Sequence, residues 1–314
     1  MTLRQSLTLE GITLACLALF ACGSDDDGLS IDPGPRTGAC ESERLVGSFE
    51  VTLDDGFTSV QGKVENHPTP LRIAETIETD GACALMGPPE LFCDPACDSG
   101  LVCGLGGLCV PEPLGISVGT VTVAGLQDPV EMTASAPVFF YSHRGSLANP
   151  GFAESDEVVL TATGDAEIEA FALGGRGIAA LATELETVEL AEGQAVALTW
   201  TPPGDAEAGS IRLELNIAQH GGTPGWIECE VPDTGSFTIP LALTDALVGR
   251  GFSGFPSLTM ERASEDSEEL SVGCVQFLLR SQIALGVTIP GLTSCSDDMD
   301  CTDGETCQAD LTCG

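Results

Sequence analysis

Cysteine spacing is the feature that most restricts how this chain can fold. Fourteen cysteines occur in 314 residues, and eight of them fall in two compact clusters: Cys93, Cys97, Cys103 and Cys109, then Cys295, Cys301, Cys307 and Cys313. In both clusters the last three cysteines share one spacing, and a glycine, Gly100 or Gly304, follows the second cysteine by three positions. The shared spacing and the shared turn glycine indicate an internal repeat of two short modules.

Each module is too short to bury a core of its own, so we expect cross-links to hold it. Zinc is the alternative, but zinc sites usually use close C-x₂-C pairs with histidines, and this chain has wider gaps and only 3 histidines. Four cysteines allow three pairings, and neighbour pairing would leave the two halves of a module unconnected. The interleaved scheme links the whole module, so we predict Cys93–Cys103, Cys97–Cys109, Cys295–Cys307 and Cys301–Cys313.

Four further cysteines lie in strand-like sequence outside the modules: Cys40, Cys83, Cys229 and Cys274. Pairing neighbours along the chain would close two loops of about 45 residues, each stabilising the fold by restricting the unfolded chain. We therefore predict the bridges Cys40–Cys83 and Cys229–Cys274. With Cys16 and Cys22 set aside at the N-terminus, the remaining twelve cysteines form an even set, as in exported proteins with a disulfide framework.

The N-terminal sequence is typical of a bacterial lipoprotein signal. An apolar run ends in Leu19-Phe20-Ala21-Cys22, and an acidic string follows Gly23. The run is about 11 residues, whereas a spanning helix needs roughly 20, so it is read as a secretory segment. We expect Cys22 to become the lipidated N-terminus, with Gly23 favouring the outer membrane, on its periplasmic or surface face. The alternative is an ordinary cleaved signal peptide that leaves Cys22 as a thiol.

Charge restricts the partners. The chain has 48 acidic and 11 basic side chains, a net charge of −37. A polyanion is repelled by nucleic acid and by anionic membrane surfaces, so both are excluded as charge partners. Basic proteins and divalent cations remain, and solubility at a cell surface is the simplest explanation of the acidity.

Between the cysteines the pattern predicts β structure. Phe49, Val51 and Leu53 alternate with polar residues before the turn Asp54-Asp55-Gly56, and residues 211–217 alternate in the same way. Further strands are expected near 60–64, 118–124, 157–163, 166–173, 196–200, 226–231, 235–239, 257–262 and 283–289. One short helix is expected between Pro240 and Gly249. Short strands separated by Gly, Pro and Asp predict an all-β fold with a β-sandwich-like main domain.

The predicted organisation has six parts. These are a signal peptide at 1–21, an acidic, Gly/Pro-containing tether at 22–39, a small disulfide-tied β unit at 40–91, the first module at 92–113, the main domain at 114–290 and the second module at 291–314. The segment 114–124 fits either the small unit or the main domain.

Motifs for chemistry are few. Gly115-Ile116-Ser117-Val118-Gly119 matches G-x-S-x-G, but a nucleophile elbow needs a following helix and here a strand-like segment follows. The histidines His67, His143 and His220 are far apart in sequence, so they indicate neither a metal site nor a triad. We therefore predict no catalytic residue and no cofactor. Of the two tryptophans, Trp200 lies on an apolar strand face and is expected in the core. For Trp226, between Gly225 and Ile227, the sequence does not decide between core and surface.

One acidic group is a weak calcium candidate: Asp297, Asp298, Asp300, Asp303 and Glu305. Its spacing departs from that of the twelve-residue EF-hand loop, and a hard cation needs a defined cage of oxygens. A solvated acidic loop is the favoured interpretation.

Two further segments, Leu198-Thr199-Trp200-Thr201-Pro202 and 229–240, together with the lipoprotein signal and the two modules, give the chain a family likeness. It resembles uncharacterised cysteine-rich lipoproteins of GC-rich Gram-negative bacteria of the myxobacterial type. The resemblance implies an architecture and no activity, so it transfers no catalytic residue.

Two functions of different class follow. The favoured one is a non-catalytic envelope lipoprotein that binds a protein or polysaccharide or contributes structurally. The alternative is an exported hydrolase that uses a carboxylate pair in the main β domain. Carbohydrate enzymes line their clefts with aromatic rings, and this chain has 2 Trp and 1 Tyr.

The lipid anchor can be tested by one substitution. Cys22→Ser should release the protein from membrane fractions, because the acyl chains would have no attachment point. Fractionation of cells followed by mass measurement of the N-terminal peptide checks this. A Cys22→Ser protein that pellets with membranes and is processed like the parent would contradict the lipoprotein interpretation.

Overall fold

Two long strands, β18 (Ser257–Leu270) and β19 (Gly273–Thr288), form the centre of the fold. They pair without interruption from Ser257 with Gly286 to Leu270 with Gly273. Gly273 has φ +143° and a side chain there would clash with Val46, so the tight turn requires glycine. Of these two strands the sequence predicted only residues 257–262 and 283–289, because four acidic side chains among residues 265–269 interrupt the alternating pattern of β18.

The computed structural model describes residues 33–54, 56–205, 209–217, 225–302 and 304–314. The signal peptide, Cys22 and most of the predicted tether lie outside these residues, as do His220 and Asp303. In the part of the chain that is described, no helix is long and apolar enough to cross a membrane.

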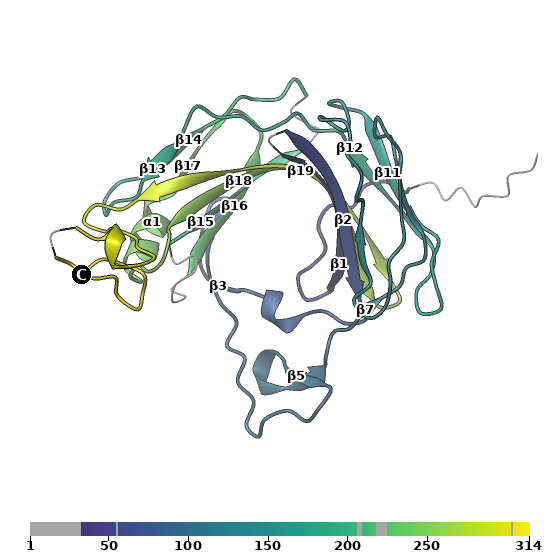
Figure 1. The fold of residues 1–314 in the computed structure, drawn as a ribbon, viewed down its shortest axis with the longest axis horizontal. Helices are drawn as coiled ribbons and strands as arrows, with labels where there is room; N and C mark the ends of the chain where they lie inside the picture. The colour runs from purple at the N-terminus through teal and green to yellow at the C-terminus, as the bar shows by residue number, and fades with distance from the viewer. Residues whose placement is uncertain (1–32, 55, 206–208, 218–224, 303) are drawn as a thin grey trace, which may run out of the picture. The chain divides into compact units, whose positions relative to one another are not determined.

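In the described residues the main sheet has eleven strands of mixed direction (Figure 1). Its order is β10-β2-β1-β19-β18-β15-β16-β4-β3, with β13 on β19 and β7 on β2. The bounds are β1 Leu45–Asp54, β2 Phe57–Glu65, β3 Glu75–Asp80, β4 Cys83–Gly87, β7 Gly115–Ile116, β10 Phe140–Ser142, β13 Thr187–Glu189, β15 Ser210–Asn216 and β16 Trp226–Pro232.

The other strands form small sheets. A four-stranded sheet has the order β12-β11-β8-β9, and two pairs are β14 with β17 and β5 with β6. Their bounds are β8 Val121–Ala124, β9 Val130–Met132, β11 Glu157–Ala162, β12 Phe171–Arg176, β14 Val196–Thr199, β17 Ser236–Ile239, β5 Leu101–Cys103 and β6 Cys109–Pro111. The predicted helix is α1, Leu241–Val248, with Leu243 and Leu247 fully buried. The all-β, sandwich-like prediction is confirmed.

Two hydrophobic cores lie on one face of the main sheet. The first is between the four-stranded sheet and the half containing β1 and β2, and includes Phe277 and Leu279 of β19. The second lies under β14, β17 and α1 and includes Leu285 and Val287 of the same strand. These residues all occupy odd positions of β19, so one strand face serves both cores.

The predicted separate β unit at 40–91 was wrong. Strand β1 pairs in parallel with β19, and β4 pairs with β16, so both belong to the main sheet. The bridges predicted for the outer cysteines were wrong for the same reason: the structure has Cys40–Cys274 and Cys83–Cys229 in place of Cys40–Cys83 and Cys229–Cys274. The prediction used loop length, whereas the sheet brings together strands that are distant in sequence.

Both modules have the interleaved bridges. Cys93–Cys103 and Cys97–Cys109 hold the first, and Cys295–Cys307 and Cys301–Cys313 hold the second. The ambiguous segment 114–124 is divided between two sheets, since β7 pairs with β2 and β8 pairs with β11.

A buried ion pair joins the second core to its covering loops. Arg262 and Asp233 are 1% and 2% exposed. Arg262 Nη1 donates to the carbonyls of Ala179 at 3.1 Å and Ala180 at 3.0 Å, and its Nε donates to Asp233. Trp200 Nε1 also donates to Asp233, at 2.6 Å, which places Trp200 in the core as predicted. The charged groups of Arg262 and Asp233 are bonded to one another and to buried neighbours, which indicates a structural role.

Removing one partner of this pair should be costly. Asp233→Asn should lower the free energy of unfolding by about 3–5 kcal/mol, because it leaves the Arg262 charge buried without compensation. Urea unfolding measures the loss, and the double variant Asp233→Leu/Arg262→Met should recover part of it. A loss below about 1 kcal/mol for the single variant would show that water reaches the pair.

Candidate functional site

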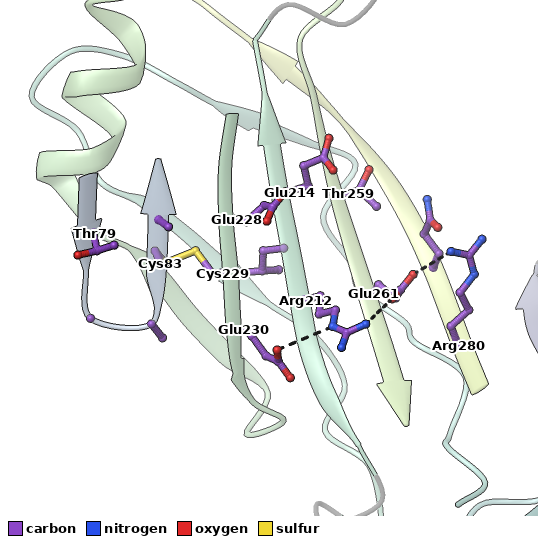
Figure 2. Close-up of a pocket in the computed structure, with 15 residues that line it drawn as sticks. Thr79, Cys83, Arg212, Glu214, Glu228, Cys229, Glu230, Thr259, Glu261 and Arg280 are labelled. Atoms are coloured by element: carbon purple, nitrogen blue, oxygen red, sulfur yellow. Dashed lines mark hydrogen bonds and ion pairs between the residues drawn. A yellow bond between two sulfur atoms is a disulfide. The ribbon is translucent and has the colours of Figure 1, made fainter. Parts of the chain in front are cut away.

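The second face of the main sheet is polar. On β15, Ile211, Leu213 and Leu215 point into the second core, so the alternating Arg212 and Glu214 point to the other side. We call this side, over β4, β16, β15, β18 and β19, the polar face. Figure 2 shows its charged side chains rising from neighbouring strands.

A pocket of about 680 Å³ lies on the polar face. The β3–β4 hairpin supplies one wall, and β15, β16, β18 and β19 supply the floor. The lining residues are Thr79, Gly81, Ala82, Cys83, Ala84, Arg212, Leu213, Glu214, Glu228, Cys229, Glu230, Thr259, Glu261, Arg280 and Gln282.

One side of the pocket floor is a ladder of ion pairs. Arg212 on β15 lies 3.9 Å from Glu230 on β16 and 3.9 Å from Glu261 on β18. Arg280 on β19 lies 3.3 Å from Glu261 and 3.1 Å from Glu50 on β1. Such partly exposed pairs add little stability, but a shared network holds the side chains in place. Burial raises the pKa of Glu261, while Arg280 and Arg212 oppose that shift.

The next row of the floor has carboxylates and no arginine. Glu214 and Glu228 are direct cross-strand partners on β15 and β16. Neutral groups donate to them: Asn216 Nδ2 to Glu214 at 3.4 Å, and Trp226 Nε1 to Glu228. Within the described residues neither carboxylate makes an ion pair. Each arginine of the ladder, in contrast, pairs with more than one glutamate.

The pocket walls partly desolvate Glu214 although its side chain still reaches solvent. This burial raises the pKa of Glu214, the neighbouring Glu228 charge raises it further, and the bond from Asn216 opposes the shift. Small residues flank the pair in register: Ala84 beside Glu228, Thr259 beside Glu214 and Ala284 beside Thr259. They leave space above the two carboxylates. The arrangement can accept a cation, and it can also donate and accept protons.

Most residues singled out by sequence lie elsewhere. His67 is exposed and His143 is partly buried, and neither lines the pocket. Gly115 and Ile116 form β7, and the next element after the G-x-S-x-G segment is strand β8, as predicted. Trp226, which the sequence placed neither in the core nor on the surface, is partly exposed and flanks the carboxylate pair.

The acidic residues of the second module cap its backbone. Asp297 accepts from the N–H of Met299 at 2.7 Å, Asp298 from Cys307 at 2.9 Å and Asp300 from Ser296 at 2.7 Å. Glu305 is exposed, and Asp303 lies outside the described residues. These bonds explain the acidity of the loop as turn capping, in line with the favoured interpretation of a solvated acidic loop.

Comparisons with known proteins add little. No family model matches the chain, and no curated protein matches it. Among solved structures, a crystal structure of chicken CNTN1 FN1-FN3 domains matches with a TM-score of 0.19 and 8% identity, over 68% of this chain and 65% of that chain. This chain therefore spans just under two thirds of that structure, and a TM-score of 0.19 does not indicate a shared fold.

The raised pKa of Glu214 predicts a pH-dependent stability effect. A carboxyl whose folded-state pKa is raised destabilises the fold when it is charged, and the penalty disappears as pH falls below the unfolded-state value. Glu214→Gln should therefore increase the stability of the protein more at pH 7 than at pH 4. Thermal unfolding at both values of pH measures the difference.

Glu169→Gln is a control with the opposite sign. Hydrogen bonds from Ser271 lower the pKa of exposed Glu169, so its charged form favours folding and its removal should destabilise at pH 7. If Glu214→Gln and Glu169→Gln shift the melting temperature in the same direction at pH 7, the environment assigned to Glu214 is wrong.

Proposed function

We propose that the protein is an exported binding protein, anchored in the outer membrane through Cys22, that holds a cationic side chain of a partner protein in the polar-face pocket. The observation that carries the proposal is the Glu214–Glu228 pair: two adjacent carboxylates in a pocket, bonded within the described residues only by neutral donors.

The disulfide bonds support an exported location. Six disulfides join the twelve cysteines of the described chain, which indicates an extracytoplasmic protein. The anchor at Cys22 and the outer-membrane location are the sequence-based part of the proposal.

Electrostatics favours a basic partner. A net charge of −37 attracts cationic proteins over long distances and raises their association rate, more so at low salt. Inside the pocket, an ammonium or guanidinium group would satisfy the oxygens of Glu214 and Glu228. Charge-assisted hydrogen bonds of this kind contribute about 1.5–3 kcal/mol each. Arg212 and Arg280 in the ladder repel a second cation, which limits how the ligand can lie.

A second candidate uses the same pair. Directly opposed residues on antiparallel strands have Cβ atoms about 4.5–5.5 Å apart. Rotation of the two side chains from these positions can bring the carboxyl groups to the separation of about 5–5.5 Å that retaining glycosidases use. The raised pKa of Glu214 suits a general acid, with Glu228 as nucleophile. An exported hydrolase is therefore the alternative, and turnover of a glycan separates it from binding alone.

A labelled hexalysine peptide tests the binding proposal. Glu214→Gln/Glu228→Gln should weaken its affinity at least tenfold, because both carboxylates that receive the cation are neutralised. The matched control is Glu41→Gln/Glu43→Gln, which removes the same charge from exposed positions near the start of the described chain and should change affinity less than twofold. Fluorescence anisotropy at physiological salt measures all three proteins.

Equal weakening by both double variants would mean that the peptide senses only net charge, and the pocket would then have no role. Screening the parent protein against a panel of glycans tests the alternative: product release that is abolished by Glu214→Gln would establish hydrolysis at this pair.

A further inference from the structure

The two cysteine modules share their spacing and bridges but differ in how they are attached. In the second module Ser294 Oγ donates to the carbonyl of Gly254 at 2.7 Å, and the N–H of Gly254 donates to the carbonyl of Asp310 at 2.7 Å. Cys295 is fully buried. The hydrogen bonds to Gly254 therefore fix the second module to the body of the protein, whereas its two disulfides lie within the module.

The first module, residues 92–113, is held together by bonds within itself. Its two bridges, the β5–β6 pair and the bond from the Glu112 N–H to the Gly100 carbonyl are all internal. Among the described residues, no hydrogen bond, ion pair or disulfide joins 92–113 to another part of the chain. None of its side chains belongs to either core.

The attachment points lie just outside the module. On one side the Glu90 N–H donates to Glu75 at 3.4 Å, and on the other Leu114 and Asn66 exchange two bonds of 2.9 Å. Leu91 precedes the module and Pro113 is its last residue, so each lies between a bonded segment and the cross-linked cysteines. A rigid body joined only through two short linkers has two hinges.

The module spans the polar side of the sheet. It follows β4, which lines the pocket, and precedes β7, which pairs with β2 near the other end. Five strands separate β4 from β2, so the chain crosses about 29 Å of sheet at about 4.8 Å per strand. Figure 1 shows β5 on the open side, away from β11, β12, β14 and β17.

The module carries the exposed apolar side chains that the pocket lacks. Phe92 is 78% exposed and Leu108 is 67% exposed. Their backbone segments lie close together, since a Cβ on Gly107, next to Leu108, would lie 3.1 Å from the Phe92 carbonyl. An aromatic ring and an aliphatic side chain suit the stem and charge of a lysine or arginine, by burial of the methylenes and by cation–π attraction.

We infer that the first module is a hinged strap that moves as a rigid body across the polar face and closes Phe92 and Leu108 over a ligand in the pocket. The motion follows from the attachment alone, whereas the identity of the ligand rests on the proposed function.

Distances between paired spin labels test the motion. In the mature protein bearing Cys22→Ser, labels at Leu101→Cys and Glu131→Cys report the strap against the four-stranded sheet. Labels at Met299→Cys and Glu131→Cys are the matched control, because Leu101 and Met299 each lie two residues before a bridged cysteine. Double electron–electron resonance should give a distance distribution at least twice as wide for Leu101 as for Met299, and hexalysine should narrow it.

Equal widths for the two pairs would overturn the inference, because the strap would then be as fixed as the second module. Phe92→Ala/Leu108→Ala should weaken hexalysine binding at least fivefold, with Leu71→Ala, another exposed apolar residue, as the control. Unchanged affinity would overturn the closing role. If hexalysine fails to bind the parent protein, the proposed function fails, and the label widths still decide whether the strap moves.

Discussion

The continuous pairing of β18 with β19 is the interaction on which the rest of the structure depends. Val275 and Phe277 of β19 contribute to the first core, and Leu285 and Val287 contribute to the second. The two cores therefore share one pair of strands as their common support. The same alternation that places these side chains inward places Arg280 and Gln282 of β19 on the polar face, so the pocket floor is a consequence of the packing behind it. Cys40–Cys274 then ties the segment before β1 to β19, and Cys83–Cys229 ties β4 to β16, so both bridges join parts of the chain that are distant in sequence.

Local features of the fold could be predicted from the sequence, and long-range pairings could not. Alternation identified the hairpin β1–β2 and strand β15, and the apolar spacing of Leu243 and Leu247 identified α1. The four bridges within the modules followed from short spacing, because few pairings can link so small a segment. The outer bridges depend on Cys83 facing Cys229 across β4 and β16, which only the strand order determines.

The pocket could not be predicted from the sequence, because it too depends on the order of the strands. Period-two alternation places Glu214 and Glu228 on the solvent sides of their strands, and that much is visible in the sequence. Their adjacency requires β15 to pair with β16, and the hollow above them requires Ala84 and Thr259 to flank them from two further strands. The charged groups on the core side and on the polar face of the sheet differ in how they are bonded. Arg262 and Asp233 are saturated and buried, whereas the carboxylates of the pocket row are left to solvent and to neutral donors.

Zero-length cross-linking tests most directly whether the polar-face pocket holds a cationic side chain. A carbodiimide joins a carboxylate to a lysine amine only when the two are in contact, and peptide mapping locates each link. With hexalysine bound at physiological salt, the account predicts links concentrated on Glu214 and Glu228. Links distributed over exposed carboxylates such as Glu41 and Glu43, with none enriched in the pocket, would contradict it.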